Sequence, residues 1–198
     1  MKRNAFSWVV LLFALVASSP AFAMLIPYTA TLNGASEFPP NASPGTGTAL
    51  VDMDTTFHTM RVQVTFSGLL GNTTSAHIHA PTAAPFAGTV GIATPPTFLG
   101  FPFGVTAGTY DQTFDLTLAS SYSSSFITNF GGGTTPGAEA ALLQAMADGK
   151  AYFDIHTSQF TGGEIRGFLA PVPIPSTLLL LGSGLVGLVG VGSWRMKK

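Results

Sequence analysis

The chain has 198 residues, no cysteine and a formal net charge of −1. Without cysteine, disulfides, thiolate metal sites and cysteine nucleophiles are excluded. The charges are unevenly placed: both ends are basic, whereas the middle holds all nine acidic residues against three basic ones, Arg61, Lys150 and Arg166, a net charge of −6. This acidity argues against nucleic acid as a partner.

The N-terminus has the three parts of a secretory signal. Lys2 and Arg3 form a positive start, the segment 9–16 is apolar, and Ala21-Phe22-Ala23 has the small residues of a cleavage site. We predict that residues 1–23 are a signal peptide and that the mature chain begins at Met24. An uncleaved membrane anchor is the alternative.

The middle of the chain, residues 24–171, is predicted to be one β domain. Apolar and polar residues alternate with a period of two in four segments, 49–53, 61–67, 114–118 and 151–156. Turn signals separate about eight such short segments, which is typical of an antiparallel sandwich or barrel.

Two segments interrupt the strand pattern. Strong helix formers between Pro136 and Gly149 predict one short helix, whose Leu142, Leu143 and Met146 should cover one end of the sheet. The segment 81–108 is rich in proline and glycine and predicts a long loop, with at most a short strand near residues 89–93. Its Phe-rich part, residues 96–103, is expected to fill the core, and an exposed apolar loop that contacts a partner or a polysaccharide surface is the alternative.

The C-terminus predicts a membrane span. The stretch from Thr177 to Trp194 is apolar, has no charged residue and would extend about 27 Å as a helix, close to the thickness of a bilayer core. The basic end, Arg195-Met196-Lys197-Lys198, should remain in the cytoplasm. We therefore expect an exported domain that is anchored in the inner membrane and lies on its outer side.

Four stretches of the middle segment resemble the CHRD domain, the module named after chordin. They are Leu32 to Pro40 (LNGASEFPP), Gly45 to Ala49 (GTGTA), Ala76 to Pro81 (AHIHAP), and Ala151 to Thr157 with Gly162 to Gly167 (AYFDIHT and GGEIRG). The resemblance implies an immunoglobulin-like or superoxide-dismutase-like β-sandwich and no established catalytic activity.

The C-terminus is similar to the PEP-CTERM sorting signal, in which a short Pro-containing motif precedes an apolar helix and a basic end. Here the motif is formed by Val172, Pro173, Pro175 and Ser176, with Ile174 in place of the usual glutamate. The resemblance implies processing by an exosortase-like enzyme, followed by delivery to the cell surface or the extracellular space. A plain single-span anchor for residues 172–198 is the alternative.

Three of the four histidines suggest a metal site. Residues two apart on a strand share a face, so His77 and His79 should point away from the core if Ile78 points into it, and His156 should do likewise beside Ile155. Imidazole suits copper and zinc. We predict a copper or zinc site of His77, His79 and His156, with Asp154 or Glu164 nearby. Structural hydrogen bonding of the same histidines is the competing interpretation.

The closing motif of the domain, GGEIRG over residues 162–167, predicts a buried polar network. Glu164 and Arg166 should share one face of the last strand, within reach of Asp154 on a neighbouring strand. Charges of this kind, when buried, hold register and fold.

The function predicted first is an exported, non-enzymatic structural or binding module of the cell envelope or extracellular matrix, with exopolysaccharide or an envelope protein as candidate partner. A copper- or zinc-binding exported protein is the second hypothesis, and no cofactor follows with certainty from sequence. An enzyme of unknown type is the third, because the usual catalytic motifs are missing or unconvincing.

Overall fold

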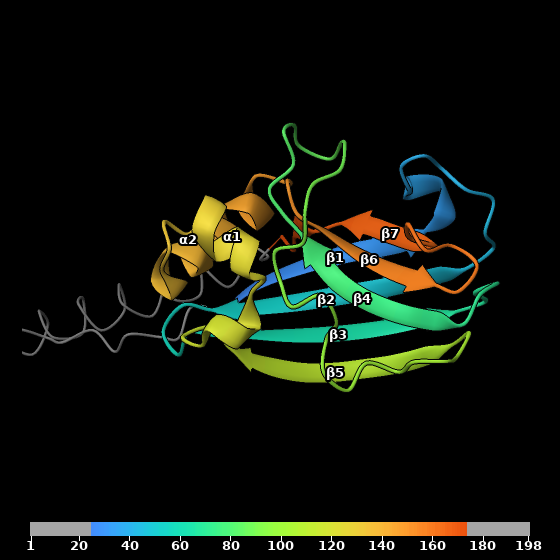
Figure 1. The fold of residues 1–198 in the computed structure, drawn as a ribbon, viewed down its shortest axis with the longest axis horizontal. Helices are drawn as coiled ribbons and strands as arrows, with labels where there is room; N and C mark the ends of the chain where they lie inside the picture. Colours follow the sequence, from blue (N-terminus) through green and yellow to red (C-terminus); the bar gives the residue numbers. More distant parts are fainter. Residues whose placement is uncertain (1–24, 174–198) are drawn as a thin grey trace, which may run out of the picture.

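The structure is a computed structural model that describes residues 25–173 (Figure 1). In this range the strands are β1 (Leu25–Asn33), β2 (Thr46–Asp54), β3 (Thr59–Ser67), β4 (Thr73–His79), β5 (Gly108–Asp115), β6 (Tyr152–Thr157), β7 (Ile165–Phe168) and β8 (Ala170–Pro171). The helices are α1 (Ser124–Asn129) and α2 (Thr135–Ala147), with the single 3₁₀ turns η1 (Gly34–Ser36) and η2 (Ala119–Ser121).

All strand pairs are antiparallel, in the order β4-β6-β7-β1-β2-β3-β5, with β8 added beside β1. The sheet curls, so that β4 crosses in front of β2 and β3 in Figure 1. Ile78 and Phe153 from one half and Val62 from the other belong to a single buried cluster. The mainly β, antiparallel architecture predicted from sequence is therefore confirmed, and the curled shape is consistent with a β-sandwich.

Period-two alternation decides which face of each strand enters the core. Val51 pairs with Val62 across β2 and β3, and both are fully buried, whereas the next pair, Asp52 and Arg61, points outward. The predicted strand over residues 114–118 was wrong. Strand β5 ends at Asp115, because its carboxylate accepts hydrogen bonds from the backbone amide and the hydroxyl of Thr117 and so turns the chain.

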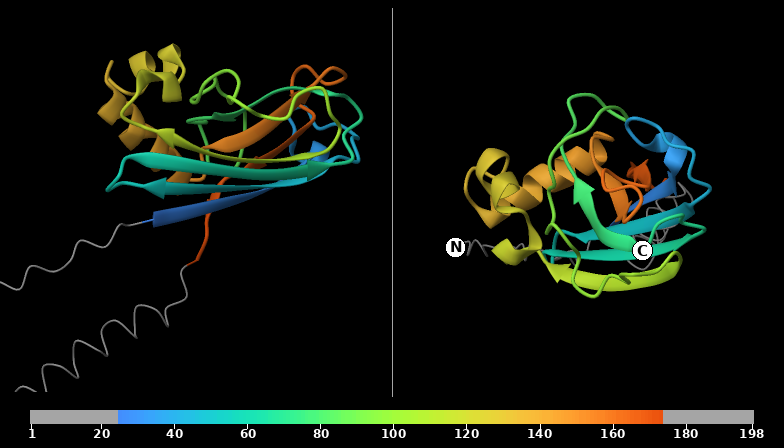
Figure 2. Two further views of the ribbon diagram at one scale, coloured as in Figure 1. Left: turned by 90° about the horizontal axis from the view of Figure 1, so that it is seen from below. Right: turned by 45° about the vertical axis from the view of Figure 1, so that its right-hand side comes forward.

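The predicted helix is confirmed as α2. The side chain of Thr134 accepts a hydrogen bond from the amide of Gly137 at its start, and Gly149 follows its end at φ 66°. Leu142 and Met146 are fully buried, so the helix is held by packing against the core. Figure 2 shows both helices over one end of the sheet. The short helix α1 was not predicted.

Within residues 25–173, none of the helices is long and apolar enough to cross a membrane. The predicted signal peptide, the predicted membrane helix over residues 177–194 and the motif residues Pro175 and Ser176 lie outside the described residues. The first two motif residues are described, and the amide of Val172 donates to the carbonyl of Pro27 on β1.

The predicted long loop between β4 and β5 is confirmed, with an isolated bridge from His79 to Ile92 in place of the short strand. Backbone amides of the loop donate to carbonyls along the free edge of β4, those of Thr73, Ala76 and Ile78. Phe98 of the loop is fully buried and stacks on Phe153 of β6 and Tyr110 of β5. This closing loop, residues 80–107, therefore covers the open side of the curled sheet and protects the free edge of β4.

Candidate metal centre

The outward face of β4 and β6 carries the polar residues of the candidate site. Ile78 on β4 and Ile155 on β6 are fully buried in the core. Their neighbours therefore project from the opposite face of the sheet: His77 and His79 from β4, and Asp154 and His156 from β6. Because the closing loop covers much of this outward face, His77 is only 4% exposed.

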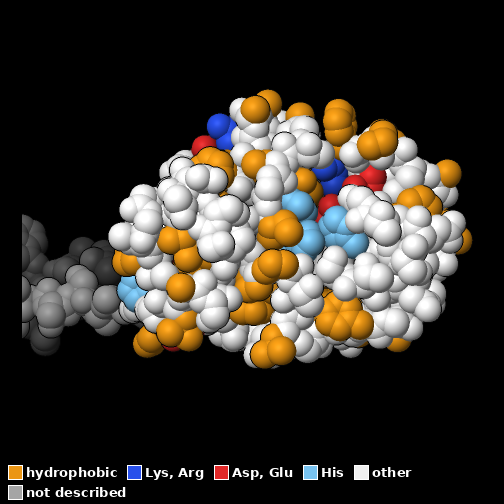
Figure 3. Space-filling model, in the orientation of Figure 1, with side chains coloured by type: hydrophobic (Ala, Val, Ile, Leu, Met, Phe, Trp, Pro, Cys, Tyr) orange, Lys and Arg blue, Asp and Glu red, His pale blue; other side chains and the backbone are white. Residues whose placement is uncertain are grey.

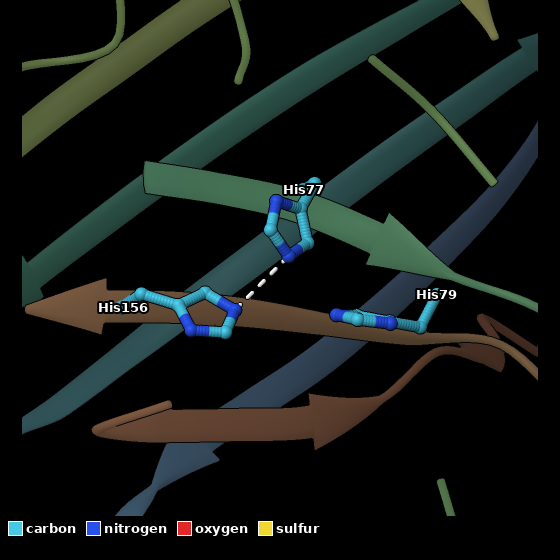
Figure 4. A group of neighbouring side chains, drawn as sticks. All are labelled: His77, His79 and His156. Atoms are coloured by element: carbon cyan, nitrogen blue, oxygen red, sulfur yellow. Dashed lines mark hydrogen bonds between the residues drawn. The ribbon is translucent and has the colours of Figure 1, made fainter. Parts of the chain in front are cut away.

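The structure brings the three histidines together. Figure 4 shows that each ring turns a nitrogen toward a common point between the two strands. The Nε2 atoms of His77 and His156 lie 3.0 Å apart, and one ring nitrogen from each of the three residues lies within 4.8 Å of the others. Figure 3 shows histidine side chains at the surface on this face, beside acidic and basic groups. The group is therefore covered but can be reached from solvent.

A backbone carbonyl fixes the tautomer of each ring. Nδ1 of His77 lies 2.8 Å from the oxygen of Pro96, Nδ1 of His79 lies 2.7 Å from that of Val90, and Nδ1 of His156 lies 2.8 Å from that of Thr161. A carbonyl oxygen can only accept, so Nδ1 donates its hydrogen in all three rings. In the neutral rings, Nε2 is then left with a bare lone pair.

Three lone pairs consequently meet in one buried place. The contact between the Nε2 atoms of His77 and His156 has no hydrogen to share when both rings are neutral, and Nε2 of His79 is buried without a hydrogen-bond partner in residues 25–173. Buried acceptors that face one another are unfavourable without a proton or a cation between them. This arrangement, with Nδ1 held by an acceptor and Nε2 free, is the one found in metal-binding histidines.

Burial keeps two of the rings neutral. Removal from water, with a smaller contribution from the neighbouring His79, lowers the pKa of His77 to about 3. Burial likewise lowers the pKa of His79 to about 4. Both rings are therefore unprotonated at neutral pH, the state required of a metal ligand.

Two buried carboxyl groups complete the polar cluster. Oδ2 of Asp154 lies 3.6 Å from Nε2 of His156 and 3.9 Å from Nε2 of His79. Because His79 is neutral, that contact is not an ion pair. Burial, together with the nearby charge of Asp154, raises the pKa of Glu37 to about 8. Glu37 therefore holds a proton at neutral pH and can donate it to Asp154.

The turn before β7 leaves room for these two carboxyl groups. Gly163 has φ 125°, and a Cβ atom there would lie 2.7 Å from Oδ1 of Asp154 and 2.8 Å from both carboxyl oxygens of Glu37. Glycine is required on both counts. The adjacent Gly162 has open space around it, so the two glycines of the closing motif differ in role.

Arg166 holds the cluster from the side of β7. It pairs with Asp154 in the strand register, but its guanidinium donates to the carbonyls of Ser36 and Gly88 and lies over the ring of Tyr152. Its Nε is 3.8 Å from Oε2 of Glu37. Arg166 therefore ties the η1 turn and the closing loop to the sheet.

Glu164 belongs to a separate set of contacts. It is fully buried and accepts hydrogen bonds from the hydroxyls of Ser43 and Thr157 and from the amides of Leu70 and Gly71. Of the two carboxylates expected near the histidines, only Asp154 lies there. The polar network predicted for Asp154, Glu164 and Arg166 is thus divided into two sets in the structure.

The fourth histidine has a different role. His58 lies in the turn between β2 and β3, half exposed, and its Nδ1 is 2.9 Å from Oε2 of Glu139 on α2. It joins a hairpin to a helix, remote in the fold from the cluster.

The fold and the site together define the class of protein: an antiparallel β domain in which three imidazoles converge. The family model described as CHRD domain matches residues 28–169, so the chain belongs to the CHRD domain family. No curated protein and no solved structure matched the chain.

Sequence reasoning assigned no role to Glu37 or Gly163. Both lie in the family motifs that the sequence displays, the glutamate in LNGASEFPP and the glycine in GGEIRG. The motifs mark these positions, but only the fold shows that segments more than 120 residues apart meet beside Asp154.

Proposed function

We propose that this chain is an exported, non-enzymatic module that binds a first-row transition metal ion, zinc or copper, through His77, His79 and His156. The observation that carries the proposal is the convergence of three Nε2 lone pairs whose Nδ1 atoms are already engaged by carbonyls. A divalent ion would satisfy all three acceptors at once.

Structural hydrogen bonding is the competing explanation. If His156 carried a second proton, it could donate from Nε2 to Nε2 of His77, and the contact between these two rings would be satisfied without metal. That arrangement leaves Nε2 of His79 without a partner in the described part of the chain. It also places a positive charge at the strand pair, where a metal ion would otherwise supply it.

Metal titration distinguishes the two explanations. The full chain, stripped of metal with a chelator, is titrated with zinc and with copper by calorimetry. We expect one equivalent to bind with a dissociation constant below micromolar, and His77→Ala or His156→Ala to weaken binding at least about 100-fold. His58→Ala is the matched control and should bind as the wild type does. Weaker than micromolar binding, or equal binding by all variants, would leave structural hydrogen bonding as the explanation.

The location of the domain is part of the proposal. Residues 1–23 would be removed on export, and residues 172–198 would hold the domain on the outer side of the inner membrane until an exosortase-like enzyme acts on the motif around Pro173. The membership of the CHRD family supports an extracellular or envelope module. Exopolysaccharide or an envelope protein is the proposed partner, and nucleic acid is not.

The mass of the mature protein from cells tests this processing. A chain that begins at Met24 and ends near Pro173 is expected. A product that extends through Lys198 would refute processing and leave the anchor, whereas a reporter fused after Pro171 that proved cytosolic would refute export.

A further inference from the structure

The carboxyl group of Asp154 lies beside two of the three convergent imidazoles. It is the direct cross-strand partner of His77, and its Oδ2 is within 4 Å of the Nε2 atoms of His79 and His156. The side chain is 4% exposed, and its other oxygen, Oδ1, forms no hydrogen bond with the described residues and faces the protonated carboxyl group of Glu37. A carboxyl group buried in this setting needs either a proton or a cation.

Arg166 does not supply that cation directly. Its hydrogen bonds go to the carbonyls of Ser36 and Gly88, and its carboxylate contact is with Glu37. Oδ2 of Asp154 therefore faces the Nε2 atoms of His79 and His156 rather than a hydrogen-bonded guanidinium. The site thus offers four donor atoms to an ion placed between β4 and β6, and the ion would displace any proton that Asp154 holds.

We infer that Asp154 is the fourth ligand, through Oδ2, and that the site is a closed zinc site with three histidines and one aspartate that stabilises the fold. This inference rests on the proposed metal-binding function and adds to it the coordination and the identity of the ion. Bonds of 2.0–2.2 Å around a tetrahedral ion place donors about 3.3 Å apart. Three of the contacts between donor atoms, at 3.0, 3.6 and 3.9 Å, lie near this value, and closing the site requires the carboxyl group of Asp154 to move toward His77.

Zinc is favoured over copper by the completeness of this donor set. Four protein donors fill the coordination of a structural zinc ion, whereas Cu(II) prefers tetragonal geometry. With no position left for a substrate, the ion would join two strands and, through the Nδ1 hydrogen bonds, the loops that contain Val90, Pro96 and Thr161. A stabilising role follows from that position, because β4 is an edge strand.

Cobalt substitution tests the inference in the full chain. Four-coordinate Co(II) has intense visible bands, and these should weaken in Asp154→Asn as water enters the coordination sphere, while zinc affinity falls at least about tenfold. Asp148→Asn, at the end of α2, is the matched control. An unchanged spectrum and an affinity within twofold of wild type would overturn Asp154 as a ligand and leave the three-histidine site standing. A wild-type chain that bound neither zinc nor cobalt would overturn the proposed function as well.

A second variant keeps the test decisive if Asp154→Asn does not fold. Asp154→Cys introduces a thiolate into a chain that has no cysteine. If position 154 is a ligand, its Co(II) complex should show a near-ultraviolet sulfur-to-cobalt charge-transfer band, and Asp148→Cys should show none. Absence of the band from a folded, cobalt-loaded Asp154→Cys protein would also refute the inference.

Discussion

Nε2 of His77 and Nε2 of His156 face each other at 3.0 Å, although each ring already uses its other nitrogen to donate to a carbonyl. Neither neutral ring has a hydrogen for this contact. The pair therefore marks a place in the fold where two buried acceptors face each other without a proton or a cation between them.

Arg166→Ala should destabilise the domain by about 3–5 kcal/mol, because removal of one member of a buried polar set leaves its partners unpaired. The side chain is 4% exposed and is held by Ser36, Gly88 and the ring of Tyr152. Denaturant unfolding measures the loss. Arg61→Ala removes an exposed ion pair with Asp111 and should change stability little. Equal effects of the two variants would contradict the role given to Arg166.

Gly163→Ala should weaken zinc binding and cost about 1–3 kcal/mol of stability, for two reasons. Alanine would have to adopt the unfavourable φ of this position, and its methyl group would press on the carboxyl groups of Asp154 and Glu37. Gly162→Ala, next to it and in open space, should stay within about 0.5 kcal/mol of wild type. Thermal melts with and without zinc compare the two. If both variants behave as wild type, the turn does not constrain the carboxyl pair.

Glu37→Gln should remove a loss of stability at alkaline pH from the metal-free protein. The folded pKa of Glu37, about 8, is raised from an ordinary value of 4.5, so between these values the folded state binds a proton that the unfolded state does not. Stability contributed by that proton is complete below about pH 4.5 and is lost as pH rises through about 8. The amide of glutamine donates at every pH, and Asp154, whose pKa burial raises to about 7, has lost its proton by about pH 8. From about pH 8 to 9 the variant should therefore melt at a nearly constant temperature, while the wild type continues to lose stability.

In acid, the histidines give the stability of the metal-free domain the opposite dependence on pH. The folded pKa values of His77 and His79, about 3 and 4, lie below the ordinary value of 6.5, so below pH 6.5 the unfolded state binds more protons. Their titration therefore removes stability as pH falls from 6.5 toward 4. Between about pH 4.5 and 6.5 this effect is offset by the two buried carboxyl groups, because the pKa of Asp154 is raised by burial to about 7 as that of Glu37 is to about 8. Melts of the wild type in a chelator should therefore show greatest stability between about pH 4.5 and 6.5, with losses on both sides. A wild type that was most stable above pH 8 would contradict the assignment of both groups.

Zinc should slow hydrogen exchange in the closing loop. His77 and His79 donate to Pro96 and Val90, so an ion that fixes both rings also fixes the loop. Amides of the loop that bond to β4, such as that of Ala93, should gain protection, whereas the turn over residues 55–58 should not. Mass spectrometry of exchanged peptides measures this. Equal protection in both segments, or in neither, would show that the ion does not act through the rings.

Local alternation was enough to predict much of the fold. On each strand, apolar residues two apart share the face that enters the core, and this could be predicted without knowing which strands are neighbours. Val51 and Val62 are buried for this reason, and so are Ile78 and Phe153; each pair meets across two strands. The helix after Pro136 followed from the propensity of its residues and from Gly149. Strand 114–118 failed because the side chain of Asp115 bonds to the chain ahead of it, a local competition that apolar spacing does not reveal.

The sequence by itself determined which residues share a face, and thus that His77, His79 and His156 point away from the core. Only the tertiary structure decided that Asp154 and not Glu164 lies beside them, and that Glu37 faces Asp154. The reason is physical: face is set by a periodicity of two residues along one strand, whereas proximity depends on strand order and on the loops that close over the sheet, which bring residues 37, 90, 96 and 163 to the same place.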